Sequence, residues 1–473
     1  MKIRILILLL STSFVSCNKW LDVKPDSQVK DTELFSSETG FKEALSGVYS
    51  ALTYEPLYGR ELTFGLMGAL GCEWDYQNNS YAADKAYAYK TSSVSLDRID
   101  AIWEGLYNAV ANDNKIIENI DAKKAIFGGE NFNVIKGEAL ALRAFIHFDL
   151  LRTFGASYAE DPNKMTIPYV TASSKQIFPQ LTVTQVIDKV LVDLLAAEEL
   201  LKADPILTGK TITIADDNGY LMNRQVHLNY YAVKGLLARV YLYKSDLVNA
   251  LANAQVVMDA TKFTWISPAA LSNRAIADLT FSSEHLFALN NIRLNAISNN
   301  AFSSTGSSVF YISKASLQDY YNSAAEDYRY LHWFKVNDAG DYYLNMYTQL
   351  TDSQWPIAYR NKMPLIKLAE IYFIAAECLQ KTDYATAVDY INKVRVARGL
   401  ISSPINAADF ETILAQEYRK ELVGEGQLFF YHKRKNNAAI PKATGLNLVQ
   451  LKGYKLPIPV AEYENGVNRV DNQ

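Results

Sequence analysis

Residues 228–258 read LNYYAVKGLLARVYLYKSDLVNALANAQVVM, and this stretch decides the fold. Apolar residues recur at helical spacing on both sides of the polar break at residues 244–246, which predicts two helices, 228–243 and 247–258. Small residues that let two helices approach closely occur in both: Ala232, Gly235, Ala238, Ala250 and Ala254. We therefore expect a closely packed helical hairpin here.

A second pair of helices is predicted at residues 364–379 and 384–396, with the small residues Ala385 and Ala387 in its second helix. Paired helices of this kind are typical of tetratricopeptide repeats, which stack helix-turn-helix units of about 34 residues. The two pairs lie much further apart than one repeat, so the array is interrupted. The sequence thus predicts an all-α fold, an interrupted tetratricopeptide-like helical repeat scaffold.

Residues 261–360 form the interruption between the two pairs. They are rich in Ser, Asn, Asp and aromatic residues, and they contain short possible strands such as residues 284–290. A long irregular insertion in a helical scaffold usually carries function. We therefore expect an irregular, loop-rich ligand-binding cap on the helical scaffold.

Hydrophobic periodicity predicts further helices in the N-terminal half, at residues 41–52, 97–120, 136–154 and 183–201. The last of these has one stripe that is expected to face inward: Val183, Val186, Ile187, Val190, Leu191, Leu194 and Leu195. Residues 18–40 lack strong periodicity and are expected to be an extended leader. A glycine-rich stretch, Gly65 to Gly71, leads into a polar loop predicted at residues 73–79.

The N-terminus has the order of a secretory signal. Lys2 and Arg4 supply a basic start, residues 3–10 are almost wholly apolar, and small residues lead to Cys17. The apolar run is shorter than the roughly 20 residues that span a bilayer. The segment Phe14-Val15-Ser16-Cys17 resembles a bacterial lipobox, with Phe where Leu is usual, which implies that Cys17 becomes a lipidated first residue. The alternative is an ordinary signal peptide with an incidental cysteine.

Several classes of protein and site lack support in the sequence. The net charge is −4 without a basic stripe, which argues against a nucleic-acid binder. The five histidines are scattered, and no zinc spacing, Gly-x-Ser-x-Gly elbow or phosphate-binding glycine loop occurs. We therefore expect no catalytic residue, no metal and no cofactor. An oxygen-ligand Ca²⁺ site in the loop Asp338–Asp341 stays open, although short acidic loops are usually only solvated.

Cys378 lies in a helical apolar context and is expected to be a buried thiol.

Aromatic residues are frequent, with 31 Tyr, 20 Phe and 6 Trp. Two groups lie in irregular regions, the first being Trp74, Tyr76, Tyr81, Tyr87 and Tyr89, and the second Tyr342, Tyr343, Tyr347 and Trp355. Aromatic faces stack on the C–H faces of sugar rings, while neighbouring Asp, Asn and Arg side chains bind hydroxyls. The candidate ligand-binding residues are Trp74, Asp75, Tyr76, Asn78, Tyr81, Tyr343, Trp355 and Arg360. We expect the two groups to meet, with rings partly open to solvent; the alternative is that each ring anchors a loop.

The chain from Cys17 to its C-terminus resembles the SusD/RagB family. The segments that carry the resemblance, in chain order, are CNKWLDVKP (17–25), GEALALRAF (137–145), KGLLARVYLY (234–243), PLIKLAEIY (364–372), INKVR (391–395), EYRKELVGEG (417–426) and LPIP (456–459). The chain departs from the family at Lys367, Tyr418 and Gln427, where Arg is frequent, and at Tyr431, where an acidic residue is common. These departures put a local salt-bridge network in doubt but not the fold.

The resemblance implies a lipoprotein of the outer membrane, anchored through Cys17 and facing the cell surface. Such a protein captures an oligosaccharide or a peptide on a surface built from loops of the two aromatic regions. It delivers the ligand to a SusC-like TonB-dependent transporter and breaks no bond. The division implied is a signal peptide (1–16), a SusD-like part with helical repeats (17–260) and a RagB/SusD C-terminal part with the insertion and closing helices (261–473).

Two other functions stay open at this point. A periplasmic scaffold would use the tetratricopeptide-like repeats to hold other proteins. A surface glycosidase would need two carboxylates in a cleft, and Glu417, Glu421 and Glu425 lie on one face of a predicted helix. Because the resemblance implies a structural role for this helix, we favour ion pairing of these glutamates with Arg419, Lys420 and neighbouring helices. Glu138 and Arg143 are likewise expected to form a packing pair.

Overall fold

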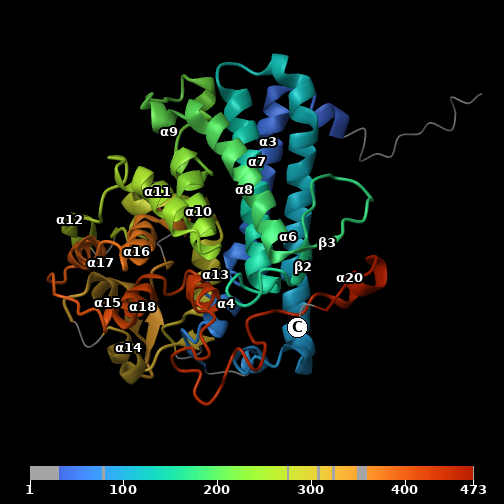
Figure 1. Ribbon diagram of the computed structural model, residues 1–473. Coiled ribbons are helices and arrows are strands. Elements are labelled where there is room, and N and C mark those ends of the chain that lie inside the picture. The colour runs from blue at the N-terminus through green and yellow to red at the C-terminus, as the bar shows by residue number, and fades with distance from the viewer. Residues whose placement is uncertain are drawn as a thin grey trace, which may run out of the picture.

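The scaffold is organised around one almost fully buried helix, α7 (Asn131–Phe154), in which 21 of 24 residues are buried. Three long helices pack with it, namely α3 (Glu38–Leu52), α6 (Ser93–Ile120) and α8 (Val183–Leu200). Figure 1 shows this bundle in blue to green beside a C-terminal half in yellow to red. The computed structural model describes residues 31–76, 80–273, 276–305, 309–321, 325–348 and 359–471.

The two predicted helix pairs are present, and the all-α, tetratricopeptide-like fold is confirmed. The first pair is α10 (Tyr230–Tyr243) and α11 (Leu247–Met258), and the second is α16 (Leu368–Leu379) and α17 (Tyr384–Ala397). Helix α11 packs against α16, so the two pairs stack in space although a long insertion separates them in sequence.

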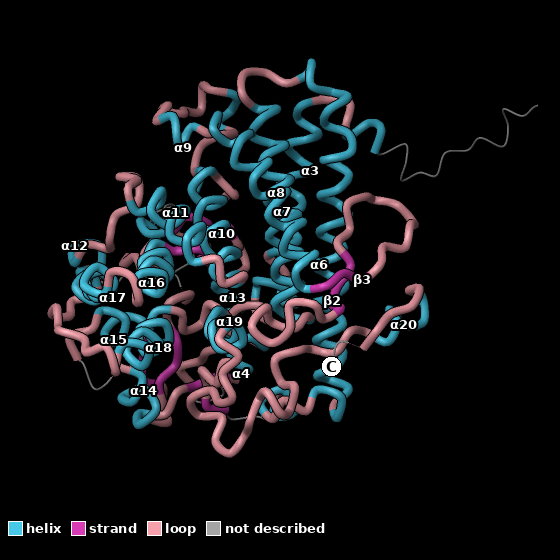
Figure 2. The backbone as a smooth tube through the Cα atoms, in the orientation of Figure 1, coloured by secondary structure: helices cyan, strands magenta, loops and turns pink. Residues whose placement is uncertain are grey.

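Short helices and strands make up the rest of the described structure, and Figure 2 shows loops and strands gathered mainly below and beside the long helices. The short helices are α4 (Leu66–Leu70), α5 (Ala82–Lys85), α9 (Pro205–Thr208), α12 (Pro268–Ser272), α13 (Leu294–Ala301), α14 (Lys314–Tyr320), α15 (Tyr328–Trp333), α18 (Phe410–Glu421), α19 (Gln427–Arg434) and α20 (Val460–Asn465). Four two-stranded antiparallel pairs occur in the described chain: β1 (Asp75–Tyr76) with β5 (Phe310–Tyr311), β2 (Met165–Pro168) with β3 (Gln180–Thr182), β4 (His285–Asn290) with β8 (Lys362–Lys367), and β6 (Phe334–Val336) with β7 (Tyr342–Leu344).

The β4–β8 ribbon confirms the strand expected at 284–290 and corrects the helix expected from residue 364. Residues 364–367 belong to β8, and α16 begins only at Leu368. A short apolar run does not distinguish a buried strand from a helix, which explains the error. Helix α10 lies directly on the ribbon: a Cβ atom added at Gly235 would meet Leu286 Cδ2 at 2.9 Å and Ile366 Cγ2 at 3.1 Å.

Three smaller expectations also need correction. Leu195 is 48% exposed, so it belongs to the outer side of α8 and not to its inward stripe. Helix α3 begins at Glu38, inside the expected leader, and the Ser37 hydroxyl caps it by accepting from the Gly40 N–H at 3.2 Å. The glycine-rich stretch contains the short helix α4.

The predicted pair Glu138–Arg143 does not form. Residues five apart on a helix point to different sides, and the two side chains find different partners. Arg143 binds Asp193 of α8 through Nε and Nη2, both at 2.7 Å. Glu138 lies 2.6 Å from Arg224 Nη1 and accepts from the Tyr49 hydroxyl at 2.7 Å. Burial alone would raise the pKa of Glu138, but Arg224 and its other partners lower the pKa to about 2.

A buried ion cluster joins the C-terminal elements, and the preference for ion pairing of the three glutamates is confirmed. Glu421, at the end of α18, accepts from Arg398 Nη2 at 2.7 Å, Lys367 Nζ at 3.0 Å and Arg329 Nη1 at 3.1 Å. Arg398 also holds Glu284, just before β4, with two bonds of 2.7 Å. The remaining members are Glu417, Lys420, Glu425, Asp327 and, at 3.7 Å from Glu417, Arg395.

The partners within the cluster differ in part from those expected. Lys420 pairs with Glu417, as expected, but Arg419 turns away to Asp319 at 3.1 Å and stacks on the Tyr320 ring at 3.6 Å. Lys367 is part of the network, so the substitution of Lys for the family's Arg does not break it.

Replacing Glu421 with Gln is expected to lower the free energy of unfolding by about 3–5 kcal/mol, because three buried cations lose their shared counter-charge. Urea unfolding followed by circular dichroism measures the loss. The matched control is Glu411→Gln on the same helix, where an exposed glutamate pairs with Lys435. The control is expected to change stability by less than about 1 kcal/mol. Equal effects of the two substitutions would contradict the role of the cluster.

Candidate functional site

The two aromatic regions meet through strand β5. Asp75 of β1 pairs with Tyr311 of β5, and Ile312 forms a bridge with Tyr342 at the start of β7. Strand β5 therefore links segments that are about 270 residues apart in the sequence, as expected from the sequence.

Trp74 is an anchor of this region and not an open ligand platform. It is 1% exposed, and its indole N–H donates to the Phe64 carbonyl at 2.8 Å. Its ring packs against Phe302 and Phe310 at centroid distances of 5.1 and 5.9 Å. The expectation that this ring is open to solvent is wrong, because a large apolar ring is more stable inside the core when its N–H finds a partner there.

Most other rings of the two regions are buried in the same way: Tyr81, Tyr87, Tyr89, Tyr343 and Tyr347. Tyr81 donates its hydroxyl to Glu61 at 3.0 Å, and burial together with Glu61 raises the Tyr81 pKa. One face of the Tyr81 ring is covered by the Arg98 guanidinium at 3.9 Å. For these tyrosines the interpretation as loop anchors holds.

The polar candidates are distributed differently. Asp75 is half-buried, accepts from the Ser313 N–H at 2.9 Å and forms an ion pair with Lys442, whose Nζ lies 3.2 Å away, so it ties β1 to the segment that follows β5. Arg360 is half-buried after the second region. Asn78 and Trp355 lie outside the described residues, as does the side chain of Tyr76.

A pocket of about 240 Å³ opens beside β5. It is lined by Arg60, Ser80, Tyr81, Arg98, Asn300, Ala301, Val309 and Phe310. Tyr81, Ala301 and Phe310 are buried, whereas Ser80 and Asn300 are exposed at the rim. Arg60, Arg98 and Asn300 were missed at the sequence level because no local pattern marks them: only the fold brings the turn before α4, the start of α6 and the end of α13 together.

Carboxylates hold both arginines of the pocket in place. Arg60 donates from Nη1 to Glu55 at 2.6 Å and from Nε to Glu61 at 2.8 Å. Arg98 pairs with Asp84 through Nη1 and donates from Nη2 to the Ser80 carbonyl at 3.2 Å. Burial works to lower the pKa of Arg60, but Glu61 offsets this and the pKa is raised. The pocket thus presents fixed guanidinium groups and an aromatic floor, with an exposed amide at the rim, which suits a hydroxyl-rich ligand.

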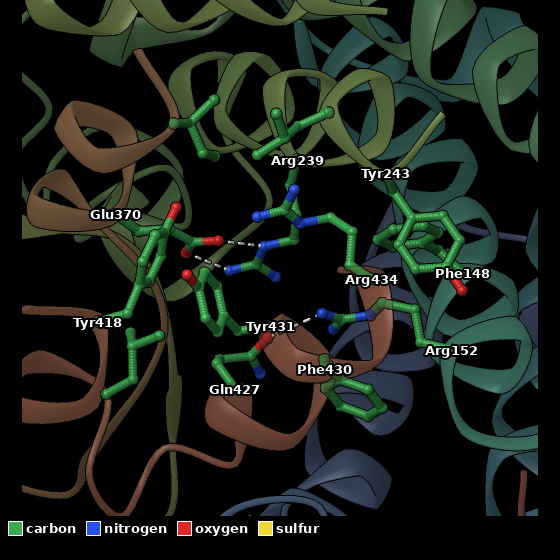
Figure 3. A pocket seen from close by; sticks show the side chains of 13 residues that line it. Phe148, Arg152, Arg239, Tyr243, Glu370, Tyr418, Gln427, Phe430, Tyr431 and Arg434 are labelled. Atoms are coloured by element: carbon green, nitrogen blue, oxygen red, sulfur yellow. Dashed lines mark hydrogen bonds and ion pairs between the residues drawn. The ribbon is translucent and has the colours of Figure 1, made fainter. Parts of the chain in front are cut away.

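A second cavity lies inside the scaffold, between α7, α10, α16, α18 and α19 (Figure 3). Its volume is only about 40 Å³, which is too small for a sugar ring. Each of its three arginines is held: Arg239 by Glu370, Arg434 by Glu377, and Arg152 by Asp149 and Gln427. We assign this cavity to the interior of the scaffold.

Three larger clefts lie elsewhere on the described surface. One, of about 930 Å³, lies beside α9 at the tip of the bundle, another, of about 710 Å³, lies between α6, residues 172–178 and α20, and the third, of about 390 Å³, lies beside α18 and α19. None of them is lined by a described residue of the two aromatic regions. The pocket at Arg60 is therefore the site that best matches the sequence prediction.

Neither a metal cluster nor a membrane span occurs among the described residues. They contain no group of three or more His, Cys, Asp or Glu side chains able to hold a metal. In the loop of the possible Ca²⁺ site, Asn337 accepts from the N–H groups of Ala339 and Asp341 at 3.0 and 2.9 Å. Over the same residues, no helix has both the length and the hydropathy needed to cross a membrane. Cys378 is a buried thiol, as expected.

Two family patterns match this chain. Residues 19–242 match a family described as "Starch-binding associating with outer membrane", and residues 297–445 match one described as "SusD family". SusD-like protein P2 of Formosa agariphila is 24% identical over 100% of this chain and 99% of its own. SusD-like protein P25 of the same organism matches at 25% identity over 30% of this chain and only 28% of its own length.

Solved structures show the same fold. A SusD superfamily protein from Bacteroides thetaiotaomicron has a TM-score of 0.73 at 22% identity, covering 92% of this chain and 100% of that one. A SusD-like carbohydrate binding protein from Bacteroides vulgatus has a TM-score of 0.66 at 20% identity, covering 85% and 84% of the two chains.

Trp74→Ala is expected to lower the free energy of unfolding by about 3–5 kcal/mol, because it empties a filled core position. Thermal and urea unfolding measure the change. Tyr54→Ala, which truncates an aromatic residue that is 54% exposed, is the control and is expected to cost about 1 kcal/mol or less. A Trp74→Ala variant with wild-type stability but weakened ligand binding would contradict the role of Trp74 as an anchor and would assign it to the binding surface.

Proposed function

Because the chain belongs to the SusD/RagB family, we propose that it captures an oligosaccharide, or a peptide, at the outer face of the outer membrane. It delivers this ligand to a partner TonB-dependent transporter of the SusC type. The family description refers to starch binding and the outer membrane, and one structural neighbour is titled a carbohydrate binding protein, which supports the oligosaccharide.

The observation that carries the proposal is the pocket at Arg60. Its buried floor contains Tyr81 and Phe310, and its rim contains Arg60 and Asn300. An aromatic floor with a few convergent polar groups is typical of small-ligand sites. The pocket is lined by Tyr81 of the first aromatic region and by Phe310 of β5, the strand that links this region to the second one. The family resemblance places the ligand on loops of these two regions.

The other two functions are less well supported. Glu417, Glu421 and Glu425 are buried in ion pairs, so they are not placed to act as acid and base on a glycan. This favours binding without catalysis over a glycosidase. In the repeat helix α10, 12 of 14 residues are buried, which leaves little of its surface for a protein partner.

Asn300→Ala is expected to weaken ligand binding roughly fivefold, as about 1 kcal/mol is lost with one hydrogen bond. A glycan and peptide array on the chain from residue 18 onward first identifies a ligand, and calorimetry then gives the affinities. Asn299→Ala, its exposed neighbour on α13, lies outside the pocket lining and is the control. Equal affinities of wild type and both variants would place the ligand elsewhere.

The anchor at Cys17 lies outside the described residues and is part of the proposal. Acyl chains contribute about 0.8 kcal/mol per buried CH₂, so several chains on one cysteine hold a protein firmly on a membrane. Cys17→Ala is therefore expected to move the protein from the membrane pellet to the soluble fraction. Fractionation in cells that lack a transporter partner measures this. A variant that stays in the pellet would contradict lipidation at Cys17.

A further inference from the structure

One cleft of the scaffold lies beside the point at which the described chain begins. We propose that the leader segment, residues 18–30, binds in the cleft between α6, residues 172–178 and α20. These leader residues lie outside the described part of the chain. The proposal rests on where Asp31 is held, on the lining of the cleft and on the amino acids of the leader segment.

The described chain begins at the margin of this cleft. Asp31 forms an ion pair with Lys115 of α6, with 3.0 Å between Oδ2 and Nζ. Ala111 and Tyr107, which line the cleft, lie one and two turns before Lys115 on the same side of α6. At about 1.5 Å per residue, one such turn is roughly 6 Å long. A chain that continues from Asp31 therefore reaches the cleft within about two or three extended residues.

Hydrogen bonds hold the walls of the cleft in place. The Ser173 N–H donates to Glu118 of α6 at 2.8 Å, and Arg469 Nη1 donates to the Phe178 carbonyl at 2.7 Å. The loop between β2 and β3 is thus tied to α6 at one end and to the C-terminal segment at the other. Figures 1 and 2 show this loop and α20 on the same side of the helical bundle.

The lining of the cleft suits apolar side chains. The cleft has a volume of about 710 Å³, and Ile177 in its lining is 48% exposed. Of the three charged side chains in the lining, Glu462 and Arg469 pair with each other at 3.1 Å. Covering apolar surface stabilises a contact by about 25 cal/mol per Å². The apolar members of the lining are Tyr107, Ala111, Pro168, Val170, Ala172, Ile177 and Phe178.

The leader segment contains apolar side chains at a suitable distance from Asp31. Trp20, Leu21 and Val23 lie 8 to 11 residues before it in the sequence. An extended chain of that length spans up to about 28–38 Å, which exceeds the two helical turns from Lys115 to Tyr107. Because the segment is tethered, its effective concentration at the cleft is on the order of millimolar. A weak contact is therefore enough to keep it bound.

The cleft beside α9 fits the leader segment less well. It also lies near the start of the described chain, since Glu38 of α3 lines it. Trp20 and Leu21 would there meet a lining rich in charge, and burying apolar groups against charged ones forfeits much of the gain. The charged residues of that lining are Glu38, Glu130, Lys202, Lys210, Asp216 and Asp217.

A bound leader segment would determine how the molecule sits on its anchor. Cys17 lies three residues before Trp20, which corresponds to about 10 Å of extended chain. With Trp20 in the cleft, acyl chains on Cys17 hold the side formed by α6 and α20 close to the membrane. This consequence rests on the lipid anchor of the proposed function, whereas binding of the leader segment in the cleft does not.

A cysteine cross-link tests the contact in the chain from residue 18 onward, which carries no anchor. Leu21→Cys is combined with Ile177→Cys in the cleft or, as the control, with Val192→Cys, at a position that is 66% exposed on α8. A disulfide requires Cα atoms within about 7 Å, and the native Cys72 and Cys378 are buried. We expect the first pair to close within one molecule at least about tenfold faster than the control pair, because the bound segment stays beside Ile177. Mass spectrometry after mild oxidation measures both rates.

A synthetic peptide of residues 18–30 provides an independent measurement. Calorimetry compares its binding to the wild-type chain and to a Trp20→Ala/Leu21→Ala chain, whose own leader segment no longer fills the cleft. We expect the peptide to bind the variant at least about tenfold more tightly, because in the wild type the tethered segment competes with it. A peptide that carries the same two alanines is the matched control and is expected to bind neither chain.

Three outcomes would overturn the proposal. The first is equal rates for the two cysteine pairs, and the second is a peptide that binds neither chain or binds both equally. The third is a cross-link that joins two molecules and disappears on dilution, since the cleft would then hold the leader segment of a second copy. Because these experiments need neither a captured ligand nor a lipid, they leave the capture of an oligosaccharide and the anchor at Cys17 to their own tests.

Discussion

The ion pairs of Glu421 are the constraint on which the rest of the C-terminal half depends. Charges removed from water are stable only when each finds a partner, and in this cluster one carboxylate serves Lys367, Arg398 and Arg329. These cations come from β8, from the residue after α17 and from α15. The elements must therefore assemble in one arrangement, because any other would leave a buried charge unpaired.

The same arrangement positions the region around the pocket. The turn after Glu421 contains Gly424, whose N–H donates to Glu73 at 2.7 Å and whose carbonyl accepts from Tyr347 at 3.0 Å. Gly424 has a φ of +78°, and a Cβ atom there would lie 2.6 Å from Leu344. Burial raises the pKa of Glu73 to about 8, so this carboxyl is protonated at neutral pH and adds no charge to the interior. Hydrogen bonds from the turn after α18 therefore fix Glu73 in the first aromatic region and Tyr347 in the second.

The sequence predicted those features that depend on local periodicity. The long helices and the two helix pairs follow from apolar residues at i, i+3 and i+4, so their positions were correct to within a few residues. The helix start predicted at residue 364 was wrong, because the short apolar run 363–366 fits a strand and a helix equally well. Trp74 was placed at the surface because its polar sequence neighbours say nothing about Phe302 and Phe310, which cover it from more than 220 residues away. Arg60 and Arg98 were missed for the same reason: the pocket is made by the fold and not by a motif.

The burial of the predicted aromatic platform changes how ligand capture is explained. Tyr81 builds a rigid wall, Trp74 packs behind Phe310, and Glu61 and Asp84 fix the two guanidiniums before any ligand arrives. A ligand then orders few side chains of the protein, so less conformational entropy is lost on binding. Affinity in such a pocket comes from single hydrogen bonds at a fixed rim, each worth about 1 kcal/mol. Binding that is moderate and reversible fits the proposed transfer of the ligand to a transporter.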